Sequence, residues 1–153
     1  MTRAWLLLHL LGFSMWIGGA LAVMVAGVAG RRESRTALGA IVRAQSLVYR
    51  VIIAPGALVT VLAGILLTFR NSGVRFPGAD LWLIIMQGGG ILAGLLTLFI
   101  SLPTASKLGR LDPEGKTGPY FDELRARQKL VGTIAGVLAL VALVAGMMVA
   151  HGA

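Results

Sequence analysis

The chain has 153 residues, of which 57% are hydrophobic and only 13% are charged, and it contains no cysteine. A soluble domain carries about 25% charged residues, so the composition excludes an ordinary soluble protein and predicts one compact bundle in a lipid bilayer. The lack of cysteine excludes disulfides, thiolate metal sites, iron–sulfur clusters and cysteine nucleophiles.

Four apolar segments follow one another along the chain. They cover residues 4–30, about 48–69, about 81–102 and about 130–150. Each is at or above the roughly 20 residues that a helix needs to cross the hydrocarbon core. Helices are expected because backbone polar groups in lipid must be satisfied within the segment. We therefore predict an all-α fold, an integral membrane four-helix bundle that forms a single domain over residues 1–153.

The first segment carries a histidine on one helical stripe. An ionisable side chain inside a span is a functional hypothesis, because hydrocarbon penalises it. His9 has three open interpretations: a cofactor or metal ligand, a proton-transfer group, or a neutral imidazole that donates to a carbonyl or to water. The stripe recurs at spacings of three, four and seven residues and consists of Trp5, His9, Gly12, Trp16, Gly19 and Val23.

Two of the spans are expected to extend beyond the membrane as helices. Apolar residues recur at helical spacing between Glu33 and Arg50, which predicts a helix that continues into the second span and bends at Pro55. Residues 121–129 predict a similar extension of the fourth span, with Thr117 and Pro119 as start signals.

Basic residues in the loops predict the orientation and account for the net charge of +8. The positive-inside rule places the first and third loops in the cytoplasm and both termini outside. Because the charges lie beside apolar spans, they give no reason to expect a nucleic-acid partner. The cations counted are Arg31, Arg32, Arg35, Arg43 and Arg50 for loop one, Arg70 and Arg75 for loop two, and Lys107, Arg110, Lys116, Arg125, Arg127 and Lys129 for loop three.

Glycines spaced four apart predict close helix packing. Gly90 with Gly94 and Gly132 with Gly136 form GxxxG patterns, and small residues let membrane helices approach closely. The pattern fits either packing within one bundle or a homodimer seam, and both interpretations stay open.

Two polar residues are candidates for a ligand site near His9. Gln87 lies at a similar depth in the third span, and glycines follow it, so it can hydrogen-bond His9, a ligand or another helix. Arg50 lies at the cytoplasmic mouth of the second span, where a guanidinium can bind a carboxylate such as a haem propionate or a lipid phosphate.

Histidines and methionines in the outer half suggest a second kind of site. His9, Met86, Met147 and His151 offer imidazole and thioether ligands that suit Cu(I). The methionines can equally be apolar filler. No span carries an internal acid, which argues against a transporter that relays protons through carboxylates.

The first two spans resemble a known family. HLLGFSMWIGG, with His9 and Trp16, and YRVIIAPGALVTVLAGILL, with Arg50 and Pro55, are similar to small four-span bacterial membrane proteins. These include the HemJ-type protoporphyrinogen IX oxidases and the membrane domain of CopD-type copper-resistance proteins. The resemblance implies haem b bound with the help of His9, and the bacterial cytoplasmic membrane as location. It also implies an essential lysine in the third span, where this chain has Gln87.

The leading prediction is a haem-b-binding membrane protein with a redox or electron-transfer role. His9 is the axial ligand, and Trp16, Arg50 and Gln87 are the other cofactor-binding candidates. The alternatives are a copper-handling protein and a non-enzymatic accessory subunit that joins a homodimer or a larger membrane complex through its glycine faces. The sequence names no catalytic residue and leaves open whether the chain is an enzyme.

Overall fold

The computed structural model describes residues 2–70 and 79–151. The predicted all-α fold is confirmed: four helices are long and apolar enough to cross a membrane, over Arg3–Arg32, Arg35–Arg70, Leu81–Leu108 and Gly115–His151. Their α-helical parts are α1 (Thr2–Ala29), α2 (Arg35–Val48), α3 (Ala54–Arg70), α4 (Ala79–Leu95), α5 (Leu102–Leu108) and α6 (Gly118–His151).

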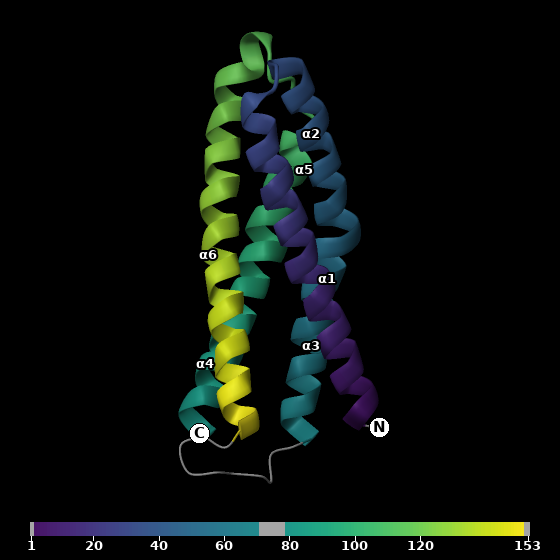
Figure 1. Cartoon of the computed structure of the whole chain (residues 1–153), viewed down its shortest axis with the longest axis vertical. Helices are drawn as coiled ribbons and strands as arrows, with labels where there is room; N and C mark the ends of the chain where they lie inside the picture. Colours follow the sequence, from purple (N-terminus) through teal and green to yellow (C-terminus); the bar gives the residue numbers. More distant parts are fainter. Residues whose placement is uncertain (1, 71–78, 152–153) are drawn as a thin grey trace.

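The helices form two hairpins that meet at one end and separate at the other. α1 packs along α3, and α4 packs along α6. Figure 1 shows the hairpins close together at the end that holds the connections 30–34 and 109–117, and apart where α1 begins and α6 ends. We call the first of these the basic end, because the charged loops one and three lie there, and the second the open end.

The α1–α3 hairpin is built around two glycines. A Cβ added at Gly56 would lie 2.7 Å from the backbone nitrogen of Trp16 and 2.8 Å from the carbonyl oxygen of Gly12. A Cβ at Gly12 would lie 2.9 Å from the carbonyl oxygen of Gly56. The two backbones therefore touch, which only glycine at both positions allows. This crossing holds α1 against α3 just inside the open end.

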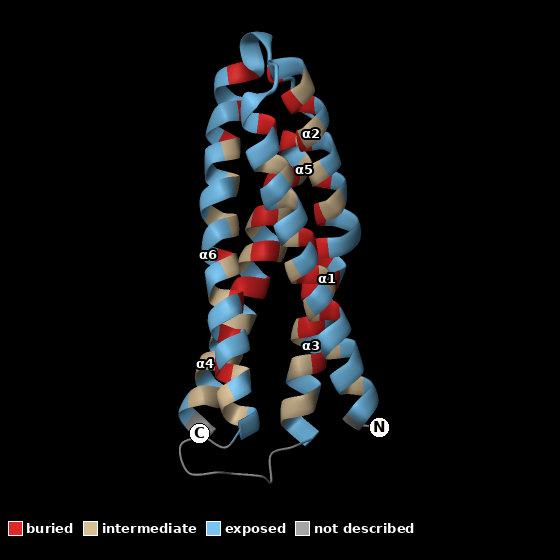
Figure 2. Cartoon of the chain, viewed as in Figure 1, coloured by how far each residue is buried: buried red, intermediate tan, exposed pale blue. Residues whose placement is uncertain are grey.

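The predicted stripe of α1 faces its neighbours. Gly12, Trp16 and Gly19 are buried, and His9 is half-buried. Trp16 belongs to the central hydrophobic cluster, which also contains Tyr49, Ile53, Ala57, Ala93, Ala105 and Ala139. Figure 2 shows buried residues along the middle and the basic end, and few at the open end. The stripe thus serves first as the packing face of α1.

Both inner helices contain a wide turn two residues before a proline. π-Helical turns at Tyr49–Ile53 and Leu96–Ser101 join α2 to α3 and α4 to α5. Pro55 and Pro103 lack a backbone N–H and would crowd the carbonyl one turn earlier. The wider turn gives that carbonyl room, and the helical segment continues through Pro55 from Arg35 to Arg70. The bend at Pro55 stays a prediction.

A second hydrophobic cluster lies at the basic end, beyond the predicted spans. It consists of Leu38, Val42, Leu108, Phe121 and Leu124, from α2, α5 and α6. The N-cap of α2 is Ser34, whose hydroxyl accepts from the backbone N–H of Ala37. Arg35 donates two hydrogen bonds to the carboxylate of Asp122, at 2.7 and 2.8 Å. The two predicted helical extensions therefore form a small core of their own together with α5.

Apolar side chains cover the outside of the long helices. Leu7, Phe69, Ile84 and Val144 are 66%, 77%, 66% and 55% exposed. Such a surface is expected where lipid is the solvent. The predicted spans lie within the observed helices, which extend past them at the basic end. Arg75 of the second loop lies outside the described residues.

Candidate functional site

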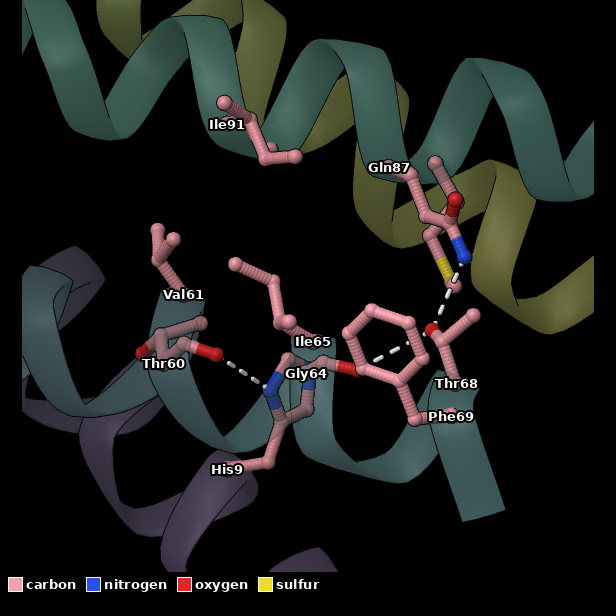
Figure 3. A pocket seen from close by; sticks show the side chains of 11 residues that line it. His9, Thr60, Val61, Gly64, Ile65, Thr68, Phe69, Gln87 and Ile91 are labelled. Atoms are coloured by element: carbon pink, nitrogen blue, oxygen red, sulfur yellow. Dashed lines mark hydrogen bonds between the residues drawn. The ribbon is translucent and has the colours of Figure 1, made fainter. Parts of the chain in front are cut away.

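A cavity of about 260 Å³ lies between α3 and α4 at the open end. Its wall is almost entirely apolar and includes Val61, Ile65, Phe69 and Ile91. Polar atoms come from His9, Thr60, Thr68 and Gln87. The only contribution from α1 is His9, whose ring reaches past α3 into this space (Figure 3). Ligand sites typically combine an apolar wall with a few such polar groups.

The imidazole of His9 is held in one orientation by the backbone of α3. Its Nδ1 lies 2.7 Å from the carbonyl oxygen of Thr60, and a carbonyl only accepts, so Nδ1 carries the proton and donates. In the neutral ring Nε2 then holds a lone pair. Among the described residues, no hydrogen bond reaches Nε2. A histidine that binds a metal usually donates its other N–H to a carbonyl or carboxylate in this way.

Gly64 provides the surface on which the imidazole rests. A Cβ added at Gly64 would lie 3.0 Å from Cε1 and 3.2 Å from Nδ1 of His9. Any side chain there would push the ring away from α3, and the hydrogen bond to the Thr60 carbonyl would be lost. Gly64 therefore fixes the position of His9 in the cavity.

A row of polar groups runs along α3 on the cavity side. Thr60 donates to the carbonyl of Gly56 at 2.7 Å, and Thr68 donates to the carbonyl of Gly64 at 3.0 Å. Gln87 donates from α4 to the Thr68 hydroxyl at 2.8 Å (Figure 3). The bond to another helix that was one of the expectations for Gln87 is therefore present, and it joins the two hairpins across the open end.

Trp16 and Arg50 lie away from the cavity. Trp16 is 4% exposed in the central cluster, and its ring end lies 4.0 Å from a Cβ built on Gly94. Arg50 is exposed and donates to the hydroxyl of Ser46 at 3.1 Å. Neither residue lines the cavity, so a ligand held there by His9 meets Gln87 but not these two.

The proposed copper ligands are brought together only in part. Met86 lines the cavity with His9, and its sulfur lies 3.2 Å from a Cβ built on Gly146 of α6. Met147 is 56% exposed, and His151 is exposed with its Nδ1 2.8 Å from the Met147 carbonyl. Within residues 2–70 and 79–151, no group of three His, Cys, Asp or Glu side chains is placed to hold a metal ion. Any metal at His9 would need Met86 or an exogenous ligand.

The cavity suits an apolar ligand that interacts with the lone pair of one imidazole nitrogen. Its volume is slightly below the roughly 300–1,000 Å³ of sites for drug-sized ligands, so a full macrocycle requires the hairpins to move apart. Here Gln87 of α4 donates a hydrogen bond to Thr68 of α3. Arg70, directly after Phe69 at the end of α3, is the nearest cation along the chain for a carboxylate at the cavity mouth.

The sequence interpretation overlooked three residues of α3. Thr60, Gly64 and Thr68 are spaced by four, which puts them on one face of a helix. A glycine or threonine at every fourth position, in an otherwise apolar span, was the available signal. The two threonines were not considered as site residues, and neither was Gly64.

Comparison of the chain with protein-family profiles, with curated proteins and with solved structures finds no match.

Proposed function

We propose that this chain is an integral membrane protein that binds haem b in the cavity between α3 and α4, with Nε2 of His9 as an axial ligand and a redox or electron-transfer role. The observation that carries the proposal is the 2.7 Å contact of Nδ1 with the Thr60 carbonyl. It leaves Nε2 as a lone-pair donor on an apolar cavity, which is what haem iron requires of a proximal histidine.

Different residues of the chain would have different roles in holding haem. His9 supplies the ligand, the Thr60 carbonyl sets its tautomer, and Gly64 sets its depth. Met86 lines the same cavity and is the candidate for a second axial ligand, since histidine with methionine is an established pair for haem iron. Haem supplies the one-electron chemistry when bound. The apolar walls would exclude water around it.

The direct test is the absorbance spectrum of the full chain, purified in detergent after expression with ample haem. We expect a Soret band in the wild type and its loss in His9→Ala. The matched control is His151→Ala, which removes the other histidine of the chain and should leave the band unchanged. A wild type without a Soret band, or a band that survives His9→Ala, contradicts the proposal.

Insertion and orientation form part of the same proposal. The apolar outside of the helices and the basic residues at one end support a bundle with both termini outside. Because the chain has no cysteine, single cysteines report on one position each. An impermeant maleimide added to intact cells should label H151C and not E114C. The reverse labelling would overturn the orientation without affecting the haem test.

Copper is the second candidate ligand, favoured because His9 and Met86 line one cavity. A soft thioether with an imidazole suits Cu(I). If Cu(I) binds there, Met86→Leu should weaken binding, whereas Met147→Leu on the exposed face of α6 should not. Equal binding by wild type, His9→Ala and Met86→Leu would exclude copper at this cavity.

An accessory role is the third candidate. Gly18, Gly88 and Gly136 have no atom within 4 Å of a built Cβ, so their helices offer flat outer faces. Such faces suit contact with another membrane helix. The role predicts that the chain purifies with a larger complex and without a chromophore. A protein that stays monomeric in mild detergent would count against it.

A further inference from the structure

A second groove lies at the basic end, on the outside of the α4–α6 hairpin. It has a volume of about 210 Å³. One wall is formed by the π-helical turn Leu96–Ser101 and by α5, and the other by α6. Its lining differs from that of the first cavity because it includes two cations. The residues used below are Phe99, Ile100, Pro103, Lys107, Tyr120 and Arg127.

The two cations face the groove without an acid beside them. No Asp or Glu is among the residues that line it. Within the described part of the chain, the one ion pair joins Arg35 to Asp122, so neither Lys107 nor Arg127 has a carboxylate within 4 Å. The ammonium of Lys107 lies 5.1 Å from the centre of the Tyr120 ring. This is within cation–π range, and it holds the charge at the groove.

The other side of the groove is apolar and exposed. Phe99 is 71% exposed, and Ile100 and Pro103 continue the wall towards Lys107. On α6, the fourth predicted span begins three residues after Arg127. The groove therefore lies where the apolar surface of the bundle gives way to its basic end. A ligand that fills it must carry a negative charge above an apolar part.

We propose that this groove binds one anionic phospholipid of the cytoplasmic leaflet. Its phosphate accepts from Lys107 and Arg127, and an acyl chain lies along Phe99 and Pro103. Basic pockets between membrane helices on the cytoplasmic side suit such headgroups. A zwitterionic lipid would bring its own ammonium against the two cations and is disfavoured. The proposal rests on the proposed membrane insertion but not on haem binding.

The test measures lipid retained by the purified full chain in native mass spectrometry. Phosphatidylglycerol and phosphatidylcholine with identical acyl chains are compared, so that only the headgroup differs. We expect the wild type to retain phosphatidylglycerol about tenfold more than phosphatidylcholine. The double variant Lys107→Gln/Arg127→Gln should lose this preference. Arg110→Gln/Lys116→Gln removes the same charge from exposed positions outside the groove and should keep it.

Three results would overturn the proposal. The first is a wild type without a preference between the two lipids. The second is an equal loss of the phosphatidylglycerol preference in both double variants, and the third is no loss of that preference in either. A further measurement with inorganic phosphate shows whether the bound anion is a lipid headgroup or free phosphate. If the chain binds inorganic phosphate but retains no lipid, the ligand of the groove is a soluble anion and the proposal is wrong. If the first double variant does not fold, Arg127→Gln alone gives the same comparison. A normal Soret band in these variants would separate this result from the haem proposal.

Discussion

The two ends of the bundle are built on different principles. At the basic end, α2, α5 and α6 enclose a hydrophobic cluster around Phe121, which is fully buried, and an ion pair crosses its surface. At the open end the two hairpins diverge, and a hydrogen bond from Gln87 to Thr68 joins them. One end is closed by packing, and the other is left with a cavity.

This difference indicates where the molecule can change shape. Elements with few buried contacts open at low free-energy cost, whereas a packed core resists movement. A ligand that enters at the open end can therefore separate the hairpins while the basic end keeps them joined. The following variants test whether the two ends are independent, beginning with the largest expected effect.

The crossing of α1 and α3 is the most sensitive point. Gly56→Val places a side chain against the backbone of Trp16 and Gly12, which cannot move aside as a flexible side chain would. We expect the hairpin to come apart, with destabilisation of about 3 kcal/mol or more. The loss of stability is measured by heating the protein in detergent and following the loss of the folded peak by size-exclusion chromatography.

Gly18→Ala is the matched control for this crossing. Nothing lies within 4 Å of a Cβ at Gly18, and alanine favours the helix over glycine by about 1 kcal/mol. Its melting temperature should be unchanged or slightly higher. If both variants lose stability alike, the crossing is not what joins α1 to α3.

Gly64, against which the His9 ring packs, should control ligand affinity more than the stability of the fold. Gly64→Ala pushes the imidazole away from α3, and loss of such a supporting contact typically costs 10- to 100-fold in metal affinity. We expect haem affinity to fall about tenfold. Gly88→Ala on α4, whose Cβ meets nothing within 4 Å, should leave it unchanged. Equal affinity in both variants would remove Gly64 from the site.

The bond across the open end should contribute a modest amount. Hydrogen bonds between membrane helices contribute about 0.6 kcal/mol on average. Gln87→Leu is therefore expected to lower the melting temperature by only about 2 °C. A double-mutant cycle with Thr68→Val isolates the pair. A coupling energy near zero would show that this hydrogen bond does not help to hold the hairpins together at the open end.

The ion pair at the basic end should have the smallest effect. The hydrogen bond from Arg35 lowers the pKa of Asp122, and the positive charge of Arg35 adds to this. A lowered pKa gives stability that is present above the ordinary value of about 3.9 and is lost as the pH falls through the lowered pKa. Both side chains are about half exposed, at 47% and 50%, so the gain is small.

Asp122→Asn should lower the melting temperature by about 1–2 °C at neutral pH, and the difference from wild type should vanish in acid. The neighbouring Glu123→Gln is the control, because Glu123 has no ion pair among the described residues. A pH-independent difference for Asp122→Asn would show that its effect does not come from the carboxylate charge.

The sequence predicted the helices and the inward face of α1 because both follow from simple periodicity. Trp16 and Gly19 are buried where the helical wheel places them. The helical extension that leads into the second span was also predicted, because leucine and valine recur there between arginines.

The cavity could not be predicted from single spans, because it depends on which helices become neighbours. The sequence paired Gln87 with His9 by depth, yet Gln87 bonds Thr68 and His9 bonds Thr60. Depth alone does not say which face of α3 meets α1 and which meets α4. The sequence grouped Met86 with His9, and both line the cavity, but it also grouped Met147 and His151 with them, which do not line it.

The wide turn at Tyr49–Ile53 affects which face of α3 points toward α1. A π-helical turn contains one residue more than an α-helical turn, and each residue rotates a helix by about 100°. Deleting one residue there, and letting the turn relax to an α-helical one, would keep the face of α3 in phase with α2. Deleting one residue after the turn, between Ala57 and Thr60, would instead rotate Thr60 and Gly64 away from His9. The position of Thr60 and Gly64 against His9 thus depends on the number of residues between the π-helical turn and the open end.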